Sequence, residues 1–147
     1  MSTTDKRPAA AAHEAGHAVV GLALGLDIVE VWIDDNGYGQ TRFSADSPEL
    51  LDHLTLAAAG GMANRAFDIE APTDMLANDH TKITSLLAGR SEDEDARLRV
   101  AGRKRARELL TPNLALLRAV ANELEAVGKI DHVRLDELVR RRGLRKA

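Results

Sequence analysis

The chain of 147 residues has the usual size of one domain, and its 44% apolar and 29% charged residues predict a soluble globular protein. It has no cysteine, which excludes disulfides, thiol nucleophiles and Cys-ligated zinc or iron–sulfur clusters. Aromatic residues make up only 3%, too few for a base-stacking platform, and the net charge of -3 is not that of a nucleic-acid-binding protein. We therefore expect no nucleic-acid partner, and any bound metal must use His, Asp or Glu.

The charge is unevenly distributed along the chain. Residues 1–90 carry 13 acidic and 6 basic side chains, whereas residues 91–147 carry 10 and 14. We interpret this as a single domain, 1–147, whose two halves dock on each other or on symmetry mates. No apolar run approaches the roughly 20 residues of a membrane-spanning helix, and the N-terminal segment makes a poor signal-peptide core. A cytoplasmic protein without a membrane span is expected.

The first expected elements are a helix and a hairpin. Residues 8–24 predict a helix that begins with a proline and ends at Gly25. Residues 28–33 (IVEVWI) form a β-branched run, the sequence DDNG at 34–37 is a strong turn signal, and 38–44 complete an antiparallel hairpin. A sheet this small must pack on a helix to be stable.

Two further helices are expected in the first half. Ser47 is predicted to cap a helix over 48–67. Its middle, AAAGG at 57–61, has little bulk, so we expect it to allow another helix to approach closely rather than to have a functional role. A loop at 68–74 then leads to a helix over 76–88.

The second half is predicted to be helical throughout. The sequence SEDE at 91–94 is a capping box that begins a fourth helix, and Thr111-Pro112 begins a fifth that ends at Gly128. Asp131 caps a last helix, which ends at Gly143. The predicted fold is α+β and mostly α, with a zinc-binding helix, a small β-hairpin and then a helical bundle.

The most informative motif is H-E-x-x-H, formed by His13, Glu14 and His17 on the first helix. Residues four apart share one helix face, so both imidazoles can reach one zinc ion. Glu14 is offset from His13 by about 100° on the helix and can instead contact a water in the open zinc position. The pattern therefore predicts a zinc-activated water with Glu14 as its general base.

A third metal ligand has to come from outside this motif. The candidates are His53, His80, His132 and many carboxylates, and spacing alone does not choose among them. Asp79 is favoured by its place near the start of a predicted helix, where an acid is locally stable, although an acid there can be a helix-start residue only.

The segment 11–21 (AAHEAGHAVVG) resembles the zinc helix of the FtsH-type peptidases, the protease domains of AAA ATPase-linked zinc proteases. That family has a hairpin after this helix, as at 28–44 here, and a helix with a Gly-Gly pair, similar to AAGGMA at 58–63. The sequence TDMLAND at 73–79 is similar to a family segment whose final Asp is the third zinc ligand. The resemblance thus implies that Asp79 ligates zinc together with the two histidines.

The C-terminal segments 107–113 and 129–131 are also similar to the family's closing region, so the resemblance covers about 11–142. It implies a Zn²⁺-dependent metalloendopeptidase that acts on unfolded or short polypeptides, with His13, His17 and Asp79 as metal ligands and Glu14 as the catalytic base. It also implies a homo-oligomer, because the family forms rings.

The sequence departs from the family at several points, among them a short loop after the hairpin and Thr73-Asp74 where the family has Thr-Gly. It holds no G-x-x-x-x-G-K-[ST] loop, so ATP-driven unfolding is expected to be absent or to come from a separate ATPase chain. His80 stands where the family usually has an aliphatic residue, and we expect it to face solvent or hydrogen-bond a ligand rather than to bind the metal.

Two alternatives remain open. One is a non-enzymatic, metal-stabilised assembly or regulatory module derived from such a peptidase, and the other is a zinc hydrolase acting on a small amide. The intact Glu14 argues against the module, because zinc binding alone does not need a base.

Overall fold

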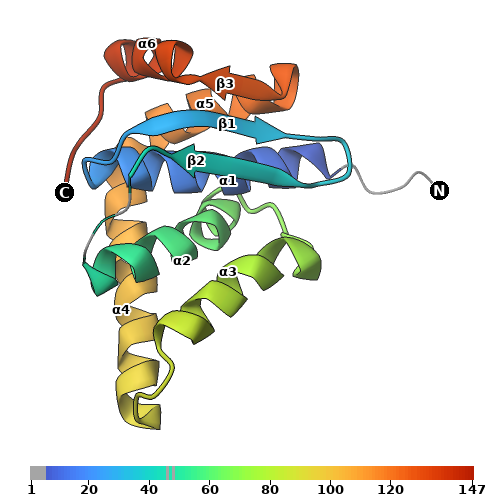
Figure 1. Ribbon diagram of the computed structural model, residues 1–147. Helices are drawn as coiled ribbons and strands as arrows, with labels where there is room; N and C mark the ends of the chain where they lie inside the picture. Colours follow the sequence, from blue (N-terminus) through green and yellow to red (C-terminus); the bar gives the residue numbers. More distant parts are fainter. Residues whose placement is uncertain (1–5, 46, 48) are drawn as a thin grey trace.

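A computed structural model describes residues 6–45, 47 and 49–147, and its helices and strands are labelled in Figure 1. In chain order the elements are α1 (Arg7–Ala23), β1 (Ile28–Ile33), β2 (Gly39–Phe43), α2 (Leu50–Ala66), α3 (Thr73–Leu86), α4 (Glu92–Leu110), the 3-10 turn η1 (Thr111–Asn113), α5 (Leu114–Val127), β3 (Lys129–Asp131) and α6 (His132–Arg142). The fold is α+β and mostly helical, as the sequence predicts.

The three strands form one antiparallel sheet in the order β2-β1-β3. The expected hairpin pairs β1 with β2, and its turn is held by Asp34, whose side chain accepts hydrogen bonds from the backbone N–H groups of Asn36 and Tyr38. β3 is not among the expected elements. It pairs with β1 and leaves the outer edge of β2 without a strand partner among the described residues.

Helix α1 lies at the centre of the molecule. In Figure 1, β1 and β2 run alongside it, α2 and α3 lie below it in this view, and α5 and α6 lie above it. The small residues of α1 and α2 let the two backbones meet closely. A Cβ atom at Gly16 would lie 2.5 Å from the carbonyl oxygen of Ala59, so the expected close helix approach is confirmed.

The predicted helix ends agree with the structure where local chemistry defines them. Gly25 and Gly128 have φ of +85° and +83°, values at which a residue with a side chain would be strained. Ser91 accepts a hydrogen bond from the Glu94 N–H, and Asp131 accepts one from the Arg134 N–H, so both caps are confirmed.

Three predicted helix starts are wrong. The fifth expected helix, placed from Thr111, begins as α5 at Leu114, because residues 111–113 form the 3-10 turn η1. Helix α2 begins at Leu50 and not at 48, and its N-cap is Glu49, because the Ser47 hydroxyl donates to Asp52 and accepts from the Glu49 N–H instead. Pro48, expected in the first turn, lies outside the described residues. Helix α3 begins at Thr73, inside the expected loop, because Pro72 has the extended backbone of an N-cap.

None of the helices in the described part of the chain combines the length and the apolar character needed to cross a bilayer.

Candidate metal centre

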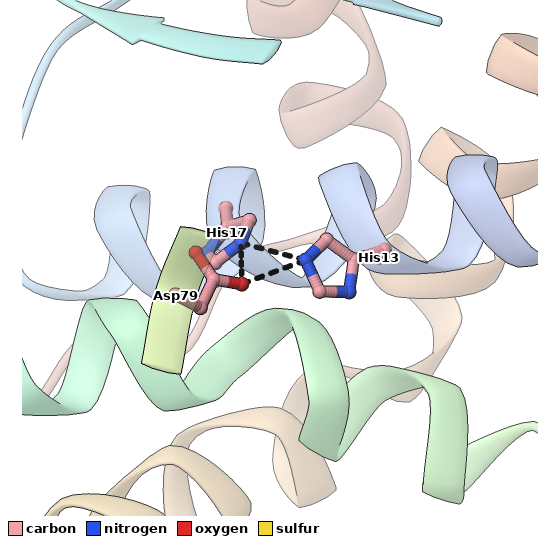
Figure 2. A group of neighbouring side chains, drawn as sticks. All are labelled: His13, His17 and Asp79. Atoms are coloured by element: carbon pink, nitrogen blue, oxygen red, sulfur yellow. Dashed lines mark hydrogen bonds and ion pairs between the residues drawn. The ribbon is translucent and has the colours of Figure 1, made fainter. Parts of the chain in front are cut away.

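Three predicted ligands from two helices meet at one point beside α1 (Figure 2). His13 and His17 project from successive turns of α1, and Asp79 reaches them from α3. The Asp79 Oδ2 atom lies 2.7 Å from His13 Nε2 and 3.1 Å from His17 Nε2, and the two Nε2 atoms are 3.2 Å apart. Asp79 is 66 positions from His13 and 62 positions from His17 in the sequence, so the fold brings distant residues into one cluster.

The other ring nitrogen of each histidine is held by a carbonyl group. Asn64 is buried on α2 and donates its Nδ2–H to the Ala9 backbone oxygen at 3.0 Å, so its Oδ1 points to His13 Nδ1, also at 3.0 Å. His17 Nδ1 lies 2.7 Å from the Leu56 backbone oxygen. A carbonyl oxygen can only accept, so both Nδ1 atoms carry a proton, and in the neutral form of either ring the Nε2 lone pair faces Asp79.

Three lone-pair donors that face one another repel unless a cation lies between them. Without a metal, a proton on a histidine Nε2 can fill this place. Burial alone would lower the pKa of His17, but the charge and hydrogen bond of Asp79 raise it to about 9. Burial would likewise raise the pKa of Asp79, but the charge of His17 and hydrogen bonds from both histidines hold it well below its usual range.

The donor set also fits a metal ion. Zinc takes His nitrogen and carboxylate oxygen with bonds of about 2.0–2.1 Å, which places tetrahedral ligand atoms about 3.3 Å apart. The three distances here are 2.7, 3.1 and 3.2 Å. Small outward shifts of the side chains bring them to that spacing, and three protein ligands leave a fourth position open.

The packing of α2 against α1 makes room for the His13 ring. A Cβ atom at Gly60 would lie 2.5 Å from His13 Cε1 and Nε2, whereas one at Gly61 would meet only Leu76 Cδ2, at 3.4 Å. We expected a packing role for both glycines. The structure instead gives Gly60 a direct part in shaping the cluster, because any side chain there would displace a candidate ligand.

Glu14 borders the cluster from the next position on α1. Its side chain is largely buried beneath β2 and accepts a hydrogen bond at Oε1 from the Thr41 hydroxyl at 3.0 Å. Glu14, the three candidate ligands and residues 37–41 of the hairpin line one cleft of about 260 Å³. The expected base therefore faces the same space as the expected metal ligands.

The other ligand candidates lie outside the cluster. His53 lines the cleft but is not part of the group that can hold one ion. His80 is exposed and lines a neighbouring groove of about 710 Å³ between α2, α3 and α4, which shares Asp79 with the cleft. His132 is exposed at the start of α6. Among the candidates that the structure describes, only Asp79 joins His13 and His17.

Two residues at the site were not identified from the sequence. Asn64 orients His13, and the only sequence signal is an amide within an otherwise small and apolar stretch of α2. Thr41 contacts Glu14, but a threonine in a strand is ordinary and gives no such signal.

Comparisons with known proteins do not assign the chain to a family. No protein-family model matches the chain, and no curated protein matches it. The resemblance to FtsH-type peptidases therefore stays a prediction, and the function is argued from the site itself.

Proposed function

We propose that the protein is a zinc-dependent metallopeptidase that cleaves unfolded or short polypeptides. The observation that carries the proposal is the convergence of His13 Nε2, His17 Nε2 and Asp79 Oδ2 within 3.2 Å, beside a largely buried glutamate. Three ligands with an open fourth position are typical of catalytic rather than structural zinc sites.

Each residue has a separate role in the proposed reaction. His13, His17 and Asp79 would hold the metal, which when bound supplies a water of lowered pKa and polarises the substrate carbonyl. Glu14 takes the proton of the attacking water and returns it to the leaving amine. Because Thr41 holds Oε1 of Glu14, Oε2 is the oxygen without a hydrogen bond among the described residues and is available for this transfer.

The cleft also suggests how a polypeptide would bind. The outer edge of β2 has no strand partner among the described residues, and residues 37–41 line the cleft beside the metal cluster. An extended substrate can pair with such an edge through backbone hydrogen bonds, which are independent of sequence. This binding mode favours a polypeptide over a small amide. A homo-oligomer and a separate ATPase chain stay predictions that follow from the resemblance alone.

The test compares the wild-type protein with Glu14→Gln after both are loaded with zinc. Metal analysis should give one zinc per chain in both proteins, because Glu14 is not a ligand. Cleavage of unfolded casein should fall by about 10²–10⁴-fold in the variant, the usual contribution of a general base.

Three outcomes would contradict the proposal. A wild-type protein without zinc removes the metal site. Zinc binding without any cleavage favours the non-enzymatic module. Equal cleavage by both proteins refutes the role of Glu14.

A further inference from the structure

Two residues of β2 form the surface on which Glu14 lies. Gly39 and Thr41 are two positions apart, so they lie on the same face of the strand, the face towards α1. A Cβ atom at Gly39 would come within 2.8 Å of Glu14 Cγ and 2.7 Å of the Trp32 backbone oxygen. Only glycine leaves space for the glutamate side chain at this point.

Thr41 fixes the direction of the Glu14 carboxylate. Its hydroxyl lies 3.0 Å from the Glu14 backbone oxygen and 3.0 Å from Glu14 Oε1. Both of these atoms are acceptors and the hydroxyl has one hydrogen, so the two atoms share it, and either bond ties Glu14 to β2. No other hydrogen bond to the Glu14 side chain occurs among the described residues.

We infer that Thr41 is the positioning residue for the catalytic base Glu14. Thr41 ties Glu14 to β2, the strand whose edge borders the substrate cleft. This inference rests on the proposed function. The hydroxyl holds Oε1 and thereby presents Oε2 to the water and to the departing amine. A misplacement of about 1 Å in such a group costs about 10²-fold in rate. Loss of the hydrogen bond from Thr41 to Glu14 should therefore have a large effect on turnover.

The placement also links substrate binding to the base. Thr41 belongs to β2, and the backbone of the same strand offers its free edge to an extended polypeptide. A substrate strand that pairs with β2 is therefore positioned relative to Oε2 through a single rigid element. Substrate and base are thus both positioned by β2. Because the pairing uses backbone groups only, it suits a peptidase that accepts many sequences.

The test uses the Thr41→Val and Thr41→Ser variants of the zinc-loaded protein. Valine keeps the shape of threonine without its hydroxyl, and serine keeps the hydroxyl. The first readout is the binding of acetohydroxamate by calorimetry, because this small metal-binding acid gives its proton to a nearby carboxylate and needs no substrate strand. Thr41→Val should weaken its affinity about tenfold, because the freed Glu14 side chain must then be immobilised when the acid binds. Thr41→Ser should stay within about threefold of wild type, because the hydroxyl is retained.

The second readout is casein cleavage. Thr41→Val should lower kcat and leave KM little changed, and Thr41→Ser should restore kcat. A role in folding alone would instead lower the melting temperature and the zinc content of the valine variant, so both are measured in all three proteins.

The outcomes separate this inference from the proposed function. Equal hydroxamate affinity in wild type and Thr41→Val overturns the role of Thr41, whether or not the protein cleaves casein. A tenfold loss that serine restores, in a protein that binds zinc and cleaves nothing, supports the positioning of Glu14 and contradicts the peptidase proposal. A wild-type protein that binds no zinc overturns both.

Discussion

In the metal-free protein, raising the pH from 6.5 to 9 should weaken the fold through His17. The Asp79 carboxylate raises the pKa of this histidine from 6.5 to about 9 in the folded state. A pKa that is higher in the folded than in the unfolded state means that the folded protein holds the proton more tightly. The resulting stabilisation is complete below pH 6.5 and is lost as the pH rises through about 9.

The size of this effect follows from the shift. Each pKa unit corresponds to about 1.4 kcal/mol, so the change from 6.5 to about 9 contributes about 3 kcal/mol to the free energy of unfolding. His17 and Asp79 are 13% and 23% exposed, so solvent screens their interaction only in part. A loss of this size is a large fraction of the stability of an ordinary domain.

Urea unfolding of the chelator-treated protein at a series of pH values measures this loss. Asp79→Asn serves as the control, because it removes the negative charge and leaves every other titrating group in place. The wild-type protein should lose about 3 kcal/mol more than the variant between pH 6.5 and pH 9. Parallel pH profiles for the two proteins would refute the electrostatic account of the cluster.

Three further predictions follow from the same site. Gly60→Ala should weaken zinc binding, because the added methyl group overlaps the His13 ring. Gly61→Ala is the control: its methyl group meets only one flexible side chain, so this variant should bind zinc like wild type. Equal zinc titrations of the two variants would show that the His13 ring does not need this space. Asn64→Leu removes the hydrogen-bond acceptor that orients the ring and should lower zinc affinity about 10–100-fold in competition with a chelator, while unchanged affinity would show that orientation is unimportant. Removal of zinc should speed amide hydrogen exchange in α3, because this helix has no buried residue and carries the ligand Asp79. Exchange in the well-packed α5 should not change. Equal exchange in α3 with and without metal would show that packing alone holds this helix.

The sequence predicts the fold well where single residues control the backbone. Gly25 and Gly128 adopt a positive φ that few other residues tolerate, so the amino-acid sequence alone indicates where these two helices end. By contrast, β3 has only three residues, too few for a recognisable alternation, and it exists because β1 offers it an edge. Such tertiary pairing leaves no local signal.

The candidate site could be predicted only in part for a similar reason. His13 and His17 are joined by helical spacing, which the sequence contains. Asp79 is brought to them by the packing of α3 on α2, which no spacing rule encodes. Its prediction rests on the resemblance and on an expected place near a helix start, but the second reason is wrong because α3 begins at Thr73. Asn64 and Thr41 act through the side chains that they touch, so their roles depend on contacts that exist only once the chain has folded.

The most direct test of the account is a crystal structure of the zinc-soaked protein with an anomalous difference map at the zinc edge. The account predicts one strong peak bonded to His13 Nε2, His17 Nε2 and a carboxylate oxygen of Asp79, with an oxygen of Glu14 facing the remaining position. A map without a peak between these side chains, or a zinc ion held by other residues, would contradict it.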